Sequence, residues 1–309
     1  MKPVGVALAS AVILAALPFL ASNYIVYLVS LIAISAILAI GLDMLTGWTG
    51  QISLGHAGFA AVGGYACWLA VIHLGIPFWL ALPLGGLCAA LVSLVIGFPA
   101  LRLSGHYLAL ATFGFGEVIQ LIIVHAERLT NGPRGLQLPT PSLGPISLAS
   151  DRALYFFIVS IAACLVILAW NLSRSSMGRA LLSIRTSELA AAAVGINLPR
   201  YKTLAFALSA FYAGIAGGLF GAVVKFLEPG AFSVWQSILY LMMIAIGGMR
   251  SIPGAIIGAA LLTVLPEALG ALQSYMELGY GVLLLIFIIF IPEGIYGRLA
   301  STLGSWRSA

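Results

Sequence analysis

The sequence has 309 residues, of which 62% are hydrophobic and 7% are charged, with 14 Lys and Arg against 9 Asp and Glu. Its mean hydropathy is +1.13, whereas an average soluble domain carries about 25% charged residues. This composition excludes a soluble enzyme and a nucleic-acid-binding domain, and its hydrophobicity excludes a disordered chain, so the sequence predicts an integral membrane protein.

Long runs without charged residues predict membrane-crossing helices. Residues 3–42 and 44–101 contain no Asp, Glu, Lys or Arg, and a helix needs about 20 apolar residues to cross the hydrocarbon, so each run holds two spans. These runs are apolar on all sides, whereas the strands of an outer-membrane barrel alternate over about 10 residues. We therefore expect an all-α membrane protein in which residues 1–309 form a single bundle of nine or ten helices.

Charges, prolines and clusters of Gly or Asn give the approximate limits of the spans. The ten expected spans lie near 4–21, 24–42, 52–73, 77–100, 105–126, 153–171, 203–224, 235–249, 252–271 and 279–297. A break in the Gly-rich third span would leave nine, and the eighth span is short. The N-terminal apolar stretch after Lys2 resembles a signal peptide, but apolar sequence resumes at Tyr24, so we expect an uncleaved first span.

The basic residues predict the orientation. Cytoplasmic loops of membrane proteins carry an excess of Lys and Arg. If both termini are cytoplasmic, ten basic residues lie inside (Lys2, Arg102, Arg174, Arg179, Arg185, Arg200, Lys202, Arg250, Arg298 and Arg307), and four lie outside (Arg128, Arg134, Arg152 and Lys225). We therefore expect cytoplasmic termini, an outward loop over 127–152 and a cytoplasmic loop over 172–202.

The fifth expected span carries a carboxylate. Glu117 lies between Thr112 and Gln120, and a charge at membrane depth costs a few kcal/mol unless it is paired or hydrated. We expect Glu117 to face the bundle interior or a cavity. Two interpretations remain open: these three residues line a translocation path, or Glu117 makes a buried hydrogen bond that locks two helices. For Glu267, near an outer helix end, an interfacial position is favoured.

The sequence contains no recognisable catalytic or metal-binding pattern. A phosphate-binding loop requires Gly-Lys-Ser/Thr, and none of the three lysines follows a glycine. The four histidines (His56, His73, His106 and His125) include no i, i+4 pair, and the three cysteines lie in apolar runs. We expect a non-catalytic chain that binds no metal and no cofactor of its own.

Two pairs of glycines indicate close helix packing. Gly214 with Gly218, and Gly254 with Gly258, have the i, i+4 spacing that lets helices approach closely.

The loop over 172–202 predicts a short helix that projects into the cytoplasm. Thr186 or Ser187 can cap its N-terminus, with Glu188 in the first turn. Alanines extend the helix, Gly195 supplies a left-handed stop, and Pro199 prevents continuation. Such a helix suits docking into a groove of a soluble partner, although an interfacial helix lying on lipid would use the arginines equally well.

Several motifs, in order, resemble the permease subunits of branched-chain amino acid ABC importers of the LivM type. They are Gly50-Gln51-Ile52-Ser53-Leu54-Gly55-His56-Ala57, Thr112-Phe113-Gly114-Phe115-Gly116-Glu117, Leu129-Thr130-Asn131-Gly132-Pro133-Arg134-Gly135, Gly178-Arg179-Ala180-Leu181 with Glu188-Leu189-Ala190-Ala191 and Gly195-Ile196-Asn197, and Gly247-Gly248-Met249-Arg250-Ser251 with Pro253-Gly254. The resemblance runs from about residue 24 to 298. Asn131 departs from the glycine that is usual at its position.

The resemblance implies a type II-like ABC importer permease in the bacterial inner membrane. Its implied partners are a homologous LivH-type permease, two LivF/LivG-type ATPase subunits that use ATP and Mg, and a periplasmic or lipid-anchored binding protein. The ATPase-coupling loop would comprise Gly178, Arg179, Arg185, Glu188, Ala190, Ala191 and Gly195. It departs from the classical Glu-Ala-Ala loop because seven steps rather than six separate the glutamate from the glycine, so only the docking role carries over.

The substrate implied by the resemblance is leucine, isoleucine or valine. Relatives import urea, amides, other amino acids and aromatic acids, and these remain alternatives. Further alternatives are a self-sufficient ion-coupled carrier or channel, which would need no ATPase, and a membrane-embedded enzyme, against which the missing catalytic pattern argues.

Overall fold

The computed structural model describes residues 3–100, 105–142, 148–268, 276–290 and 294–305. The helices are α1 (Pro3–Leu20), α2 (Asn23–Leu42), α3 (His56–Leu74), α4 (Phe78–Ala100), α5 (His106–His125), α6 (Glu127–Thr130), α7 (Asp151–Arg174), α8 (Ser176–Thr186), α9 (Glu188–Ala193), α10 (Leu198–Val224), α11 (Val234–Gly247), α12 (Ile252–Ala268), α13 (Met276–Phe290) and α14 (Gly294–Ser305). A π-helix, η1 (Asp43–Gly47), extends α2, and 3₁₀ turns form η2 (Gly132–Arg134) and η3 (Pro229–Phe232). The chain is therefore an all-α bundle, as predicted.

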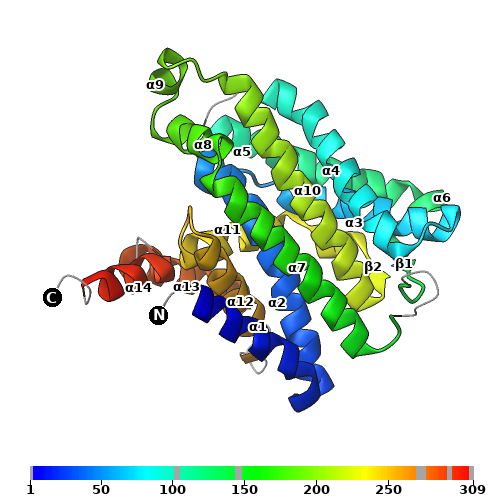
Figure 1. Ribbon diagram of the computed structural model, residues 1–309. Coiled ribbons are helices and arrows are strands. Elements are labelled where there is room, and N and C mark those ends of the chain that lie inside the picture. The colour runs from blue at the N-terminus through cyan, green and yellow to red at the C-terminus, as the bar shows by residue number, and fades with distance from the viewer. Residues whose placement is uncertain (1–2, 101–104, 143–147, 269–275, 291–293, 306–309) are drawn as a thin grey trace.

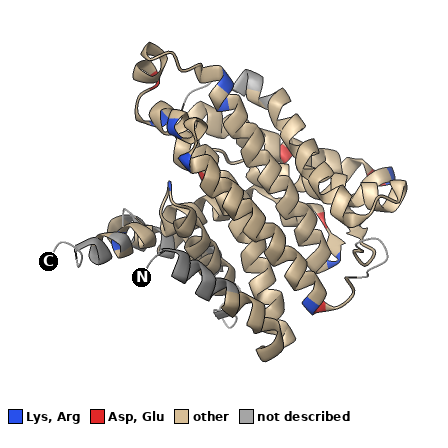
Figure 2. Ribbon diagram, viewed as in Figure 1, with Lys and Arg blue, Asp and Glu red and all other residues tan. Residues whose placement is uncertain are grey.

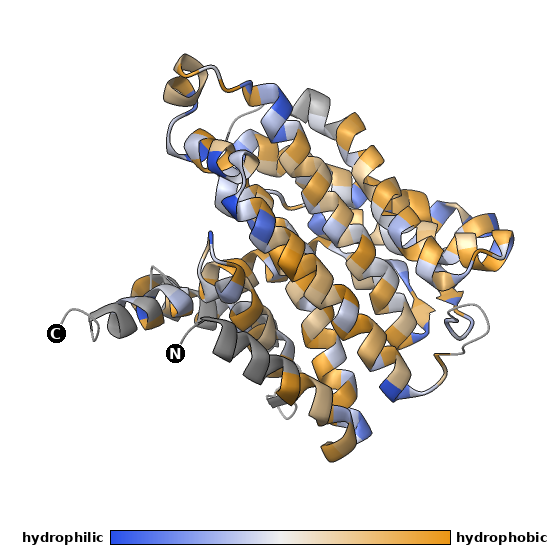
Figure 3. Ribbon diagram, viewed as in Figure 1, coloured by the Kyte–Doolittle hydropathy of each residue, from blue (hydrophilic) through white to orange (hydrophobic). Residues whose placement is uncertain are grey.

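Six helices in the described part of the chain are long and apolar enough to cross a membrane. They are Asn23–Gly47, His56–Leu74, Phe78–Val95, His106–His125, Asp151–Arg174 and Leu198–Val224. Val234–Gly247 and Ile252–Pro266 are shorter apolar helices, so the eighth expected span is indeed short. Figure 3 shows hydrophobic residues along the length of the long helices and hydrophilic residues mainly near their ends.

Two expected spans differ from the structure. The third begins at His56 rather than near residue 52, because residues 50–55 are not helical, and its glycines do not interrupt α3. The last expected span, near 279–297, is not one helix: α13 ends at Phe290 and α14 begins at Gly294. Gly294 has a φ of +76°, a left-handed conformation that a continuous helix cannot accommodate.

Helix α10 lies at the centre of the bundle, packed against α4, α3 and α2. The approach to α3 and α4 is close because glycines meet there: a Cβ on Gly214 would lie 2.8 Å from Ala89 Cβ and 3.0 Å from Gly86 Cα. A Cβ on Gly218 would lie 2.7 Å from Leu82 Cδ1. In the α11–α12 pair, a Cβ on Gly254 would lie 2.6 Å from the carbonyl oxygen of Gly248, and Gly258 packs against Met243.

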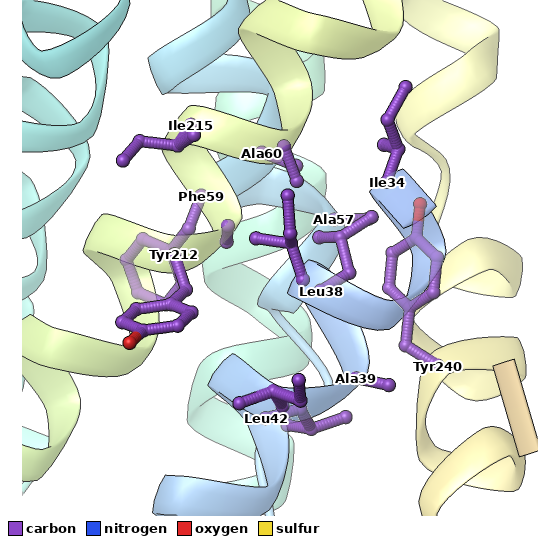
Figure 4. Close-up of a cluster of buried hydrophobic side chains, with 14 of the residues drawn as sticks. Ile34, Leu38, Ala39, Leu42, Ala57, Phe59, Ala60, Tyr212, Ile215 and Tyr240 are labelled. Atoms are coloured by element: carbon purple, nitrogen blue, oxygen red, sulfur yellow. The ribbon is translucent and has the colours of Figure 1, made fainter. Parts of the chain in front are cut away.

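The core continues from α10 directly to α2, and α11 contacts both α2 and α3. Figure 4 shows side chains of four helices in one buried cluster: Ile34, Leu38, Ala39 and Leu42 of α2, Ala57, Phe59 and Ala60 of α3, Tyr212 and Ile215 of α10, and Tyr240 of α11. Nearly all of these side chains are fully buried. Helix α2 is therefore an internal helix that contacts α10, α12, α7 and α11.

The two ends of the bundle differ in structure. Helices α8 and α9 lie at one end, with α9 standing apart from the long helices, whereas α6, β1 (Leu136–Gln137) and β2 (Phe226–Leu227) lie at the other (Figure 1). The two strands pair antiparallel, with Leu136 opposite Leu227. Figure 2 shows Lys and Arg gathered at the α8 end.

Candidate functional site

Helices α8 and α9 begin at serine caps. Ser175 Oγ accepts a hydrogen bond from the backbone N–H of Gly178 at 3.3 Å, and Ser187 Oγ accepts one from Ala190 N–H at 3.2 Å. Of the two capping candidates, Ser187 therefore takes this role, because Thr186 Oγ1 instead donates to the carbonyl oxygen of Leu182 at 3.0 Å. A cap between α8 and α9 fixes the turn by satisfying backbone groups that a helix start leaves free.

Helix α9 ends at Gly195, as its sequence predicts. Gly195 has a φ of +85°, and the backbone N–H of Ile196 donates to Ala191 O at 3.0 Å while that of Gly195 donates to Ala192 O at 3.0 Å. This pair of bonds is the Schellman arrangement that closes a helix C-terminus. Asn197 then caps α10 by accepting from Arg200 N–H at 3.1 Å, so Pro199 lies in the first turn of the next helix.

An ion pair joins α9 to α10. Lys202 Nζ lies 2.7 Å from Glu188 Oε1, and the two side chains are 11% and 52% exposed. Sequence analysis missed this pair because the residues are separated by a helix end and a turn, where no i, i+4 rule applies. Glu188 therefore both occupies the first turn of α9 and contacts α10 through Lys202.

Helix α9 has one packed position and a broad exposed surface. Ala191 is 2% exposed, whereas Leu189 is 87% and Val194 is 77% exposed. Ala190 is also exposed. An exposed apolar surface at the tip of a projecting helix is typical of a protein contact.

Arg185 anchors α8 to the end of α2. Its Nη1 donates to the carbonyl oxygens of Thr46 and Gly47, both at 2.6 Å. These carbonyls belong to the π-helix η1, where the hydrogen-bond pattern of α2 changes. Burial lowers the pKa of the Arg185 guanidinium, and nearby Arg250 lowers it further. Arg185 is therefore a structural link between α8 and α2.

The other expected residues of α8 have different surroundings. Gly178 is buried against the end of α7, within reach of Leu172 and Ser173 backbone atoms. Arg179 is exposed, and its Nη1 donates to Arg174 O at 2.9 Å. Arg179 is thus free to contact a partner at one end of its side chain, whereas Gly178 allows α7 and α8 to meet.

Asp43 joins the same π-helix to the turn between α11 and α12. Its Oδ1 accepts a hydrogen bond from the backbone N–H of Arg250 at 2.8 Å, and Asp43 is 1% exposed. Arg250 has a φ of +65°. The sequence gave no signal for this contact, since 207 residues separate its two members.

The three expected path residues on α5 do not converge on one site. Thr112 is buried, and its Oγ1 accepts from Leu54 N–H at 2.9 Å and donates to Ala109 O at 3.0 Å, so it locks α5 to the segment before α3. Gln120 Nε2 lies 3.5 Å from Pro229 O of η3. The three side chains therefore do not form a common lining.

Glu117 does not face the interior of this chain. It is exposed, as is its neighbour Val118 at 53%, and nothing lies within 4 Å of a Cβ placed on Gly114. The expectation of an interior position, and with it the helix-locking hydrogen bond, is therefore wrong for the isolated chain. Glu117 lies near the middle of the membrane-capable helix His106–His125, on an outer face of the bundle. The side chain of Glu267 lies outside the described residues.

Asn131 has a backbone conformation that explains the residue found there. Its φ is +61°, and its Nδ2 donates to Gly135 O at 2.9 Å. Asparagine is, after glycine, among the residues that best tolerate this left-handed region. The departure from glycine therefore leaves the turn between α6 and β1 intact.

A family model described as "Branched-chain amino acid transport system / permease component" matches residues 24–291. The chain is 34% identical to the high-affinity branched-chain amino acid transport system permease protein LivM of Escherichia coli K12, over 92% of this chain and 72% of the relative. It is 27% identical to the corresponding LivH protein of Salmonella typhimurium, over 85% and 91% of the two chains. It is also 26% identical to the autoinducer 2 import system permease protein LsrC of an Enterobacter species, over 81% and 69%.

Proposed function

Because the chain belongs to the family of permease components of branched-chain amino acid transport systems, we propose that it is a permease subunit of an ABC importer for leucine, isoleucine and valine. Two of its relatives, LivM and LivH, are both permease proteins of such systems. We infer that this chain likewise pairs with a homologous, LivH-type permease and that the two enclose the translocation path. Its role is transport rather than catalysis.

The observation that carries this proposal is the α8–α9 projection. Helix α9 stands apart from the bundle (Figure 1) and exposes Leu189 and Val194, while Glu188 and Lys202 hold it at a fixed angle. A preformed apolar helix binds a groove at low entropic cost. In this proposal two LivF/LivG-type ATPase subunits supply such grooves. They also bind ATP and Mg, since no lysine of this chain follows a glycine as a phosphate-binding loop requires.

The proposed topology has ten crossings of the bacterial cytoplasmic membrane, with both termini inside. Six crossings correspond to the long helices, and α1, α11, α12 and α13 supply the others. The basic residues at the α8 end then obey the positive-inside rule (Figure 2). The loop over 127–152, with the β1–β2 pair, faces outward, where a substrate-binding protein docks.

We assign the exposed face of α5 to the contact with the second permease. An isolated carboxylate facing lipid at mid-membrane costs a few kcal/mol, and Glu117 is exposed there beside Phe113, Val118 and Leu121. A homologous permease covers this face and brings polar groups or water to Glu117. In this proposal Glu117 then lines the path between the two subunits without Thr112, which instead joins α5 to the segment before α3.

The transported solute could differ from branched-chain amino acids within the same importer class. The relative LsrC is a permease protein of an autoinducer 2 import system, so members of this group differ in solute. Urea, amides, other amino acids and aromatic acids are the alternatives in this importer class. Branched-chain amino acids are favoured because LivM is 34% identical over 92% of this chain, whereas LsrC is 26% identical over 81%.

Extraction of the tagged chain from its native membrane in mild detergent tests the proposal. We expect a second permease and two ATPase subunits to copurify, and leucine uptake in vesicles to require ATP and the binding protein. A homo-oligomer that moves solute without ATP would contradict the importer and favour a self-sufficient carrier or channel. Uptake of another solute by an intact, ATP-dependent complex would contradict the substrate class alone.

A further inference from the structure

A cavity of about 230 Å³ lies inside the bundle, away from the α8–α9 projection. Residues of α2, α3, α10, η3, α11, α12 and α13 line it. Its α2 lining runs from Leu31 to Leu38, the middle part of the span Asn23–Gly47. The lining residues Ala216 and Phe220, in the last third of α10, place the cavity within the spans but toward their η3 end.

The lining of the cavity suits a small, largely aliphatic molecule. Leu31, Ile34, Leu38 and Met243 supply apolar surface, and none of the described residues that line the cavity is charged. Figure 4 shows Ile34, Leu38 and Tyr240 around this part of the core. Pockets for drug-sized ligands span about 300–1,000 Å³, so this smaller cavity fits a solute the size of one amino acid.

The hydroxyl group of Thr263 on α12 has an unusual environment. Its Oγ1 is buried and has no hydrogen-bond partner among the described residues, although it lines the cavity. Other helical hydroxyls in this chain donate to their own helix: Ser30 Oγ lies 2.8 Å from Val26 O, and Thr203 Oγ1 lies 2.8 Å from Pro199 O. A buried polar atom without a partner is destabilising, so Thr263 leaves a polar group available to a ligand.

Further polar groups line the cavity. Ser35, Gln236, Tyr240 and Tyr280 contribute hydroxyl and amide groups to an otherwise apolar lining. A pocket with apolar walls and a few polar groups fixes the orientation of a small solute. This combination matches a molecule with an aliphatic side chain and a polar end.

The turn η3 places the cavity beside the expected path. Ala231 and Phe232 of η3 line the cavity, while the carbonyl oxygen of Pro229, in the same turn, lies 3.5 Å from Gln120 Nε2 of α5. The turn is therefore the wall between the cavity and α5, the helix that carries Glu117.

We propose that this cavity is a transient binding site for the transported amino acid, in which the aliphatic side chain contacts α2 and α11 and the polar end contacts Thr263. The inference rests on the proposed function and adds the place in the chain where substrate is held. The substitution Thr263→Val tests it, because it removes the hydroxyl group while keeping the shape of the side chain.

The Thr263→Val variant is measured in the complete importer, in vesicles with its ATPases and binding protein. We expect leucine uptake to fall about fivefold, as for loss of one hydrogen bond, while the thermal stability of the complex is unchanged or higher, since no hydrogen bond within the protein is lost. Thr112→Val is the matched control, because Thr112 makes two protein hydrogen bonds and its loss lowers thermal stability. Unchanged uptake by the Thr263→Val importer would overturn the proposal.

Photolabelling of the unmodified complex provides a test that needs no variant. A diazirine analogue of leucine is supplied during ATP-driven uptake, and labelled peptides are mapped. We expect labels on α2 and α11 that excess leucine suppresses. Labels confined to α5, or labels that leucine does not suppress, would overturn the cavity site. A complex that takes up a different solute in place of leucine would instead contradict the proposed substrate class, and uptake measured beforehand identifies that case.

Discussion

Glu188 Oε1 lies 2.7 Å from Lys202 Nζ and so ties the first turn of α9 to α10, the central helix of the bundle. The pair joins the projecting helix α9, whose surface is largely exposed, to α10. The side chain of Lys202 on α10 is only 11% exposed. A partner that moves α9 would therefore also act on α10 through this ion pair. Arg185 forms a second connection, from α8 to η1 at the end of α2.

Replacing Glu188 with glutamine removes the charge but keeps the size of the side chain. Because the pair is partly exposed, we expect the free energy of unfolding to fall by less than about 1 kcal/mol. We also expect leucine uptake per ATP hydrolysed to fall by up to about fivefold. This factor corresponds to the same loss of about 1 kcal/mol, here from the docked position of α9. The measurement is the ratio of uptake to ATP hydrolysis in reconstituted vesicles. Arg200→Gln, which removes an exposed charge at the same end of the bundle, is the control. An unchanged ratio for Glu188→Gln contradicts the docking role.

Replacing Gly195 with alanine strains the end of α9. Its φ of +85° costs a residue with a Cβ roughly 1–2 kcal/mol, although nothing within 4 Å obstructs that Cβ. We expect coupled uptake to fall and the chain to remain in the membrane. Gly75→Ala is a matched control: Gly75 ends α3 with a φ of +63° and also has open space around it. Equal losses of uptake in the two variants would show that strain, not docking, is responsible.

Arg185→Met removes the two hydrogen bonds to η1. Hydrogen bonds of a charged group contribute about 1.5–3 kcal/mol, so we expect a lower melting temperature in detergent and a lower ratio of uptake to ATP hydrolysis. Arg179→Met is the control for the melting temperature alone, because Arg179 is exposed and bonds within its own segment, to Arg174 O. If both arginine variants melt at the same temperature as the unmodified protein, the hydrogen bonds of Arg185 to η1 do not contribute to stability.

Substitutions of Glu117 test whether the exposed face of α5 contacts lipid or a second permease. Since Glu117 is exposed in this chain, Glu117→Leu changes the stability of the isolated subunit by no more than about 0.5 kcal/mol. We expect the same substitution, and Glu117→Gln, to lower leucine uptake in the assembled importer. The measurements are the melting temperature of the subunit and the uptake rate of the complex. Leucine uptake by the Glu117→Leu importer at the unmodified rate would mean that α5 faces lipid.

Features that depend on local sequence were predictable. The absence of charges over residues 44–101 identified membrane helices, because burial of about 20 apolar residues is a property of the segment itself. The start of α9 at a Ser cap and its end at Gly195 follow from backbone groups within a few residues of each other. The ordered motifs from residue 24 onward identified the family that the match over residues 24–291 establishes.

The tertiary structure alone decided which of these residues meet. Glu188 pairs with Lys202, Arg185 reaches Thr46, and Asp43 binds the backbone of Arg250 across 207 residues; no periodicity encodes such contacts, because they depend on how whole helices pack. The same holds for Glu117, whose exposure depends on which face of α5 the neighbouring helices cover. Composition and capping thus determined the class of protein and its local helices, whereas packing determined the connections between the docking helices and the membrane core.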